Sequence, residues 1–217
     1  MTAVHPRTAT AGFTRTAMIA CAVASPLLIA LSLLLAPYPA TLEGEPYIRA
    51  FTAHLDGYAL LSWLGVLSFA TLIPGLLAVS RVARDGRPVL GLVGTILAFI
   101  LTLPAIDTDE VIYAAIRAGL DVPTTHRLVT EVNEGLPTSA LGFTFFLALL
   151  GLVLLGVAAL SSAAPKWAAI ALIVAPLLIP VAWLAQLSNV AAGAAWLILT
   201  AAMGGVALAL PQPREKA

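Results

Sequence analysis

Three carboxylates stand close together in the longest polar interruption of this chain, at Asp107, Asp109 and Glu110. A carboxyl group held partly out of water can act as a proton donor near neutrality, and a like-charged neighbour strengthens that tendency. We therefore take these three residues as candidate catalytic acids. The segment from Asp107 to Gly135 contains six of the eleven acidic residues and is the first place to look for chemistry.

The same acidic residues also fit a purely structural role. Asp107 and Glu110 have the spacing of a capping box, in which the first side chain accepts backbone N–H bonds and the second reaches back. A helix over about 108–118 would follow, and a second over about 124–135. The pair would form a helical lid across the mouth of whatever lies beneath, with its carboxylates as caps and solvated charges.

Aromatic residues are the second possible component of a site. If several converge beneath the helical lid, their rings would form a pocket able to stabilise a carbocation through cation–π contact. Outer carboxylates could approach the same pocket. The candidate substrate-binding residues are Glu45, Asp56, Trp63, Tyr113, Phe143 and Phe146.

The composition of the chain is very apolar, and from it we predict the elements that position these residues. The chain is 60% hydrophobic and 10% charged, with a mean hydropathy of +1.00; a soluble domain is about 25% charged. This predicts an all-α polytopic membrane protein, a six-transmembrane-helix bundle in a single membrane domain over 1–217. A span needs about 20 apolar residues. The predicted spans are about 16–36, 57–82, 89–106, 138–160, 167–187 and 190–210, with outer loops 37–56 and 107–137.

The first apolar run, 16–36, has two interpretations. A cleaved signal peptide would have an apolar core of only about 7–15 residues, and this run is longer. The sequence Ala36–Ala40 that follows it is also a poor small-x-small cleavage site. We expect a retained span.

Basic residues predict the orientation of the six spans. Cytoplasmic loops carry an excess of Lys and Arg. Eight of the eleven basic residues fall on one side with the termini, and three fall in the outer loops, so we expect both termini to be cytoplasmic in a bacterial cell membrane. The cytoplasmic set is Arg7, Arg15, Arg81, Arg84, Arg87, Lys166, Arg214 and Lys216; the outer set is Arg49, Arg117 and Arg127.

Apart from Arg81 at the inner end of the second, the predicted spans contain no Asp, Glu, Lys, Arg or His. The strongly polar candidates are Gln186 at the end of the fifth span and Asn189 just before the sixth. Intramembrane charges usually mark proton relays and ion-coupled sites, so a proton-coupled transporter is disfavoured. Neither His54 nor His126 belongs to a tight metal motif, and we predict no metal and no cofactor. Cys21 is the single cysteine, which excludes an intramolecular disulfide. No basic face indicates nucleic acid; the expected partners are the lipid bilayer and a lipophilic small molecule.

Two hairpin sequences carry a resemblance to known proteins. The stretches Leu76–Gly94 and Gly156–Trp167 resemble those of a broad group of small six-span bacterial membrane proteins. In size and character the chain is also similar to the membrane-integral terpene cyclases of indole-sesquiterpenoid, drimane-type pathways. That resemblance implies cyclisation of a prenyl chain, initiated by a proton from an acidic residue. It assigns no catalytic position in this sequence.

Three functions remain open from the sequence. The first is a membrane enzyme or binding protein with an outward-facing acidic and aromatic site for a lipophilic molecule, the cyclase being its most specific form. The second is a non-enzymatic membrane partner or immunity-type protein that uses the helical lid as a contact surface. The third is a passive transporter or exporter subunit, in which the prolines at 74, 104, 176 and 180 allow helices to move.

Overall fold

The computed structural model describes residues 6–39, 41–103 and 108–212. These residues form helices and turns and contain no strand, which confirms the all-helical fold class. In chain order the elements are α1 (Pro6–Leu35), α2 (Gly44–Thr52), α3 (Leu55–Gly86), α4 (Pro88–Ala98), the 3₁₀ helix η1 (Phe99–Thr102), α5 (Thr108–Arg117), α6 (Val122–Glu134), α7 (Leu136–Ala159), α8 (Lys166–Leu184) and α9 (Asn189–Ala207).

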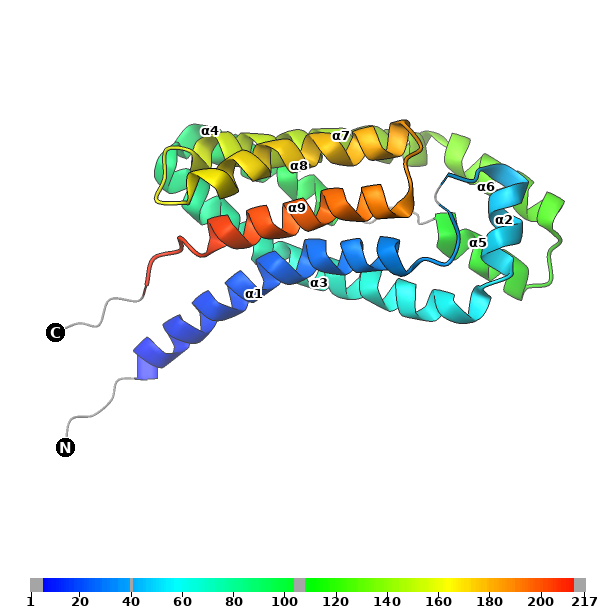
Figure 1. Ribbon diagram of the computed structural model, residues 1–217, viewed down its shortest axis with the longest axis horizontal. Helices are drawn as coiled ribbons and strands as arrows, with labels where there is room; N and C mark the ends of the chain where they lie inside the picture. The colour runs from blue at the N-terminus through cyan, green and yellow to red at the C-terminus, as the bar shows by residue number, and fades with distance from the viewer. Residues whose placement is uncertain (1–5, 40, 104–107, 213–217) are drawn as a thin grey trace.

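Most helices run side by side, and the short helices α2, α5 and α6 gather at one end of the bundle (Figure 1). Helices α1, α3, α4, α7, α8 and α9 follow the long axis, whereas α2 lies across the end where α5 and α6 are also found. We call this the outer end, following the orientation predicted from charge. The described chain begins and finishes at the opposite, inner end.

Among the described residues, five helices are long and apolar enough to cross a membrane: α1 from Gly12 onward, α3, α7 from Gly142 onward, α8 and α9. They coincide with five of the six predicted spans. The third predicted span, 89–106, corresponds to the shorter apolar segment Pro88–Thr102. Its α-helical and 3₁₀ turns cover about 25 Å, less than the ~30 Å of a hydrocarbon core. The membrane character is therefore supported, and the count of six spans stays a prediction.

Small residues and hydroxyls hold the bundle together. A Cβ added at Gly151 of α7 would lie 2.3 Å from the backbone nitrogen of Ala98, so the backbones of α7 and α4 approach as closely as glycine allows. Two hydroxyl contacts flank α3. Ser68 Oγ donates to the Ser25 carbonyl of α1 at 2.8 Å, and the Ser80 and Thr95 hydroxyls lie 2.5 Å apart between α3 and α4. Such contacts replace the hydrophobic driving force that lipid does not supply.

At the inner end of the bundle, basic side chains donate hydrogen bonds to carbonyl groups at the C-termini of helices. Arg15 donates from Nε to the Leu210 carbonyl and from Nη2 to the Leu208 carbonyl, both at 3.0 Å, just beyond α9. The Lys166 ammonium donates to the Leu160 carbonyl at the end of α7. A cation at a helix C-terminus satisfies orphan carbonyls and complements the helix dipole. These residues thus have a local role besides the one predicted for orientation.

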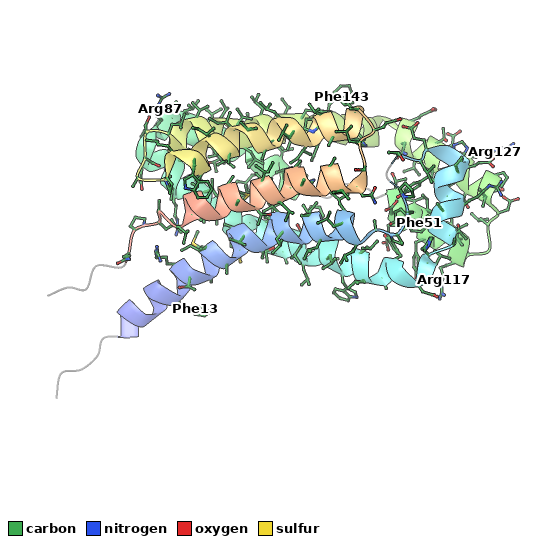
Figure 2. All side chains as sticks on the ribbon, in the orientation of Figure 1. Phe13, Phe51, Arg87, Arg117, Arg127 and Phe143 are labelled. Atoms are coloured by element: carbon green, nitrogen blue, oxygen red, sulfur yellow. The ribbon has the colours of Figure 1, made fainter. Side chains whose placement is uncertain are left out.

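The charges are separated along the molecule in the manner predicted. Arg87 lies at the inner end, and Arg117 and Arg127 lie at the outer end (Figure 2). Which end faces the cytoplasm stays a prediction from the positive-inside rule.

Single cysteines test this orientation. In a Cys21→Ser background, Glu131→Cys on exposed α6 should react with a membrane-impermeant maleimide in intact bacteria, whereas Arg84→Cys at the exposed inner turn should react only after lysis. Labelling is measured by the mass shift of the purified protein. Reaction of Arg84→Cys alone in intact cells would reverse the orientation.

Candidate functional site

Two of the predicted acids lie in the wall of a cavity. Asp109 and Glu110 occupy the first turn of α5 and line a space of about 760 Å³ at the outer end. The remaining wall comes from the outer ends of α1 and α9, from α2, and from one face of α3. This volume lies within the usual range for small-molecule sites, roughly 300–1,000 Å³.

Tyrosine hydroxyls donate hydrogen bonds to both carboxylates. Tyr47 Oη lies 2.7 Å from Asp109 Oδ1, and Tyr38 Oη lies 3.3 Å from Asp109 Oδ2. Tyr58 Oη lies 2.5 Å from Glu110 Oε2. The two neighbouring acids thus connect α5 to separate elements: Asp109 to the α1–α2 link and α2, and Glu110 to α3.

The aromatic rings around these carboxylates form a continuous cluster. Phe51, which is fully buried, has its ring centroid 5.2 Å from that of Tyr38 and 5.1 Å from that of Tyr58. Tyr47 meets Tyr38 edge-on at 5.5 Å, and Tyr113 lies 4.9 Å from Tyr58. With Ile48 and Ile112 these rings make a small core at the outer end, separate from the core of the long bundle.

The local sequence explains why Tyr38 turns toward the cavity. Helix α1 stops at Leu35, because Pro37 and Pro39 disfavour continued helix. Asn189, at the start of α9, fixes the turn that follows α1. Its Nδ2 donates to the Tyr38 carbonyl at 2.9 Å and to the Ala36 carbonyl at 3.4 Å.

Helix α2 is positioned by its apolar stripe and by one glycine. Ile48 and Phe51, three positions apart, are its buried residues. Gly44 at its start has φ +60°, and a Cβ there would lie 3.2 Å from His126 Nε2 of α6. Only glycine adopts this conformation without strain while allowing α6 to come so close.

Gln186 and Asn189 lie in a different setting from the one predicted. Helix α8 ends at Leu184, earlier than the predicted 187, so Gln186 belongs to the α8–α9 link. Its Nε2 donates to Glu43 Oε1 at 2.6 Å. The polar residues at the end of the fifth predicted span therefore bind the α1–α2 link.

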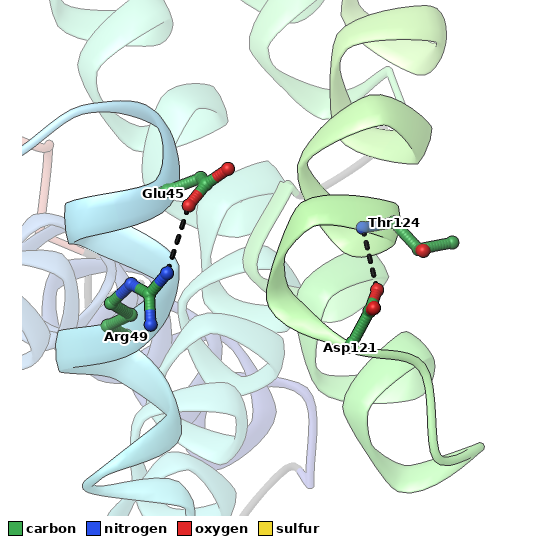
Figure 3. Close-up of polar contacts among 4 residues, drawn as sticks. All are labelled: Glu45, Arg49, Asp121 and Thr124. Carbon is green, nitrogen blue, oxygen red and sulfur yellow. Dashed lines mark hydrogen bonds and ion pairs between the residues drawn. The ribbon is translucent and has the colours of Figure 1, made fainter.

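Most of the other predicted binding residues lie away from the cavity. Glu45 forms an ion pair with Arg49 at 3.0 Å on the surface of α2 (Figure 3). Asp56 is exposed in the first turn of α3, and Trp63 is 64% exposed. Phe143 and Phe146 of α7 are also exposed and do not line this cavity.

The two remaining candidates are Tyr113 and Asp107. Tyr113 does not line the cavity, but its ring packs on Tyr58, which does. Asp107 lies outside the described residues, so its predicted role as cap or acid stays a prediction.

The two short helices of the predicted lid are present at nearly the predicted bounds, as α5 and α6. Helix α6 starts at Val122, two residues earlier than predicted, because Asp121 is its N-cap and accepts from the Thr124 backbone N–H at 2.9 Å (Figure 3). Hydrogen bonds from the Thr124 side chain and backbone lower the pKa of Asp121. Asp121 therefore serves the helix end.

A second, more apolar cavity of about 290 Å³ lies deeper in the bundle. Its wall includes Ser25 and Ile29 of α1, Leu72 of α3 and Leu199 of α9. Phe69 of α3 lines both cavities. The two cavities are thus neighbours along α3, the more acidic one nearer the outer end.

The sequence reasoning missed Tyr38, Tyr47 and Tyr58. A usable signal was present: the chain has four tyrosines, at 38, 47, 58 and 113, and all of them fall in or beside the outer loops.

As for metals, no group of three or more His, Cys, Asp or Glu side chains within the described ranges is arranged to hold an ion.

No family model matches this chain, and no curated protein or solved structure is significantly similar to it. The function must therefore be argued from the geometry of the outer end.

The bond between Tyr47 and Asp109 should contribute to stability. Tyr47→Phe removes this 2.7 Å hydrogen bond, and we expect the free energy of unfolding to fall by about 1 kcal/mol. For a chain of this size that is a decrease of roughly 2–4 °C in Tm, measured in maltoside micelles. Tyr113→Phe is the matched control, since no described residue bonds to its hydroxyl. Equal decreases for both variants would contradict this assignment.

Proposed function

We propose that this chain is a multi-pass membrane protein that binds a lipophilic small molecule in its outer-end cavity. The observation that carries the proposal is the position of Asp109 and Glu110, which line a cavity whose other walls are mainly aromatic and apolar. Binding sites for small molecules commonly combine such walls with a few polar groups that orient the ligand. Five long apolar helices support the membrane setting.

The proposal includes an orientation and a location. With both termini cytoplasmic, the outer end would face the outside of a bacterial cytoplasmic membrane, as the distribution of basic residues favours. Helices α5 and α6 would then act as the helical lid over the cavity. A lipophilic ligand would reach the site from the bilayer.

The enzymatic form of this proposal is a membrane terpene cyclase. A protonated Asp109 or Glu110 would transfer its proton to an alkene carbon of a prenyl chain, forming a C–H bond and breaking the π bond. The resulting carbocation would cyclise and return a proton to the carboxylate, so that the net reaction is an isomerisation. The tyrosine rings beside these acids favour this reading, because aromatic faces stabilise cations.

A cavity-filling substitution tests ligand binding. Gly65 lines the cavity, and a Cβ added there would have no atom within 4 Å, so Gly65→Phe should fill the space without disturbing the fold. We expect photocrosslinking to a diazirine- and alkyne-tagged farnesol in membranes to fall about tenfold, equivalent to losing ~1.4 kcal/mol of binding.

The matched control is Gly57→Phe in the same helix. Gly57 has equally open surroundings but does not line the cavity. Its crosslinking should equal that of the wild type and be suppressed by excess untagged farnesol. Equal labelling of the wild type and Gly65→Phe would remove the support for this binding site.

Amide substitutions test the cyclase form. Asp109→Asn and Glu110→Gln keep the side-chain size but cannot supply the proton, so the variant of the true acid should lose cyclised product about 10²-fold or more. Product is measured by gas chromatography and mass spectrometry after incubating membranes with farnesol. Glu131→Gln, on the exposed face of α6, is the control. Full turnover in both amide variants would exclude the two acids as proton donors.

A further inference from the structure

The geometry points to the charge of the ligand. We propose that the outer-end cavity takes an amphiphilic cation, with a substituted ammonium head beside Asp109 and Glu110 and an apolar tail along α3. This inference rests on the proposed function, since it names the ligand class of the same cavity.

The wall of the cavity carries a negative charge at Glu110. Glu110 receives a neutral hydroxyl from Tyr58, and among the described residues no cation lies within ion-pair distance of it. Among the described residues, the ion pair that forms joins Arg49 to Glu45, which does not line the cavity. A carboxylate in an apolar-walled space attracts a cation more strongly than one in open water. The ligand would supply the missing positive charge.

The same wall contains three tyrosine rings. Tyr38, Tyr47 and Tyr58 line the cavity and place their rings beside the two carboxylates. Their hydroxyls are already engaged with carboxylate oxygens, and the part of each ring that lines the cavity is the part that a ligand would contact. A substituted ammonium group needs no hydrogen-bond acceptor and binds to ring faces through cation–π attraction. Rings and carboxylates together favour such a head over a neutral or anionic one.

One face of α3 offers a path for the apolar tail of the ligand. On α3, Ser62, Gly65, Val66 and Phe69 follow Tyr58 along one face and all line the cavity. The axial distance from Tyr58 to Phe69 is about 16 Å, at 1.5 Å per residue. Phe69 also lines the deeper apolar cavity, so the tail would point toward the more apolar part of the bundle. A medium-length alkyl or isoprenoid chain fits this path.

The same wall disfavours a zwitterionic lipid headgroup. A phosphocholine head would bring its phosphate toward Asp109 and Glu110, and like charges at close range repel each other. We therefore commit to an ammonium amphiphile without a phosphate.

The experiment uses the full chain in neutral maltoside micelles. Isothermal titration would compare three probes: decyltrimethylammonium, its uncharged isostere with carbon in place of nitrogen, and decanoyl-lysophosphatidylcholine. Micelles without protein provide the blank. We expect the cation to bind about tenfold more tightly than either other probe, and Glu110→Gln to weaken its binding about tenfold. Glu131→Gln, an exposed outer carboxylate that does not line the cavity, should bind like the wild type.

The outcomes separate this inference from the proposed function. If the isostere or the lysolipid binds as tightly as the cation, or if Glu110→Gln has no effect, while Gly65→Phe still abolishes binding, the cationic ligand is refuted and the lipophilic cavity stands. If Gly65→Phe leaves binding of every probe unchanged, both proposals fail. The thermal stability of Glu110→Gln is measured in parallel, so that a folding defect is not mistaken for lost binding.

Discussion

The cost of placing charge in an apolar environment governs this structure. An unpaired carboxylate or ammonium is costly to leave in hydrocarbon, and the described charged residues lie toward the two ends of the bundle. At the inner end they close helix termini, as Arg15 does for α9. At the outer end Asp109 and Glu110 receive tyrosine hydroxyls instead. The ends therefore differ in chemistry, and at the outer end two acids line a cavity.

Helices could be predicted from the sequence wherever the signal is local. Apolar runs marked five spans to within a few residues at most ends, and turn and cap residues marked α5 and α6. The exceptions are also local in origin: Asp121 caps α6 earlier than Pro123 suggested, and the apolar segment Pro88–Thr102 ends in a 3₁₀ turn, short of the predicted 106.

The site was predictable only in part, because its contacts join distant segments. Asp109 and Glu110 were identified by their chemistry alone, yet their partners lie 71, 62 and 52 residues away along the chain. No periodicity encodes such pairings. Phe143 and Trp63 were attractive as aromatic residues near the ends of spans, but each lies on an outward-facing side of its helix. The restriction of all four tyrosines to the outer segments was the compositional clue.

Helix α3 has 32 residues and is therefore about 48 Å long, well beyond the ~30 Å hydrocarbon thickness. If Arg81 marks the inner boundary of the hydrocarbon, the outer boundary would fall near Leu61. The buried Tyr58 would then lie at the depth of the lipid headgroups, while Val66 and Phe69, each more than half exposed, would face acyl chains. The cavity would straddle the surface of one leaflet and open sideways into it. A ligand could then be taken from lipid without crossing water, and its partitioning into that leaflet would set the concentration at which the site fills.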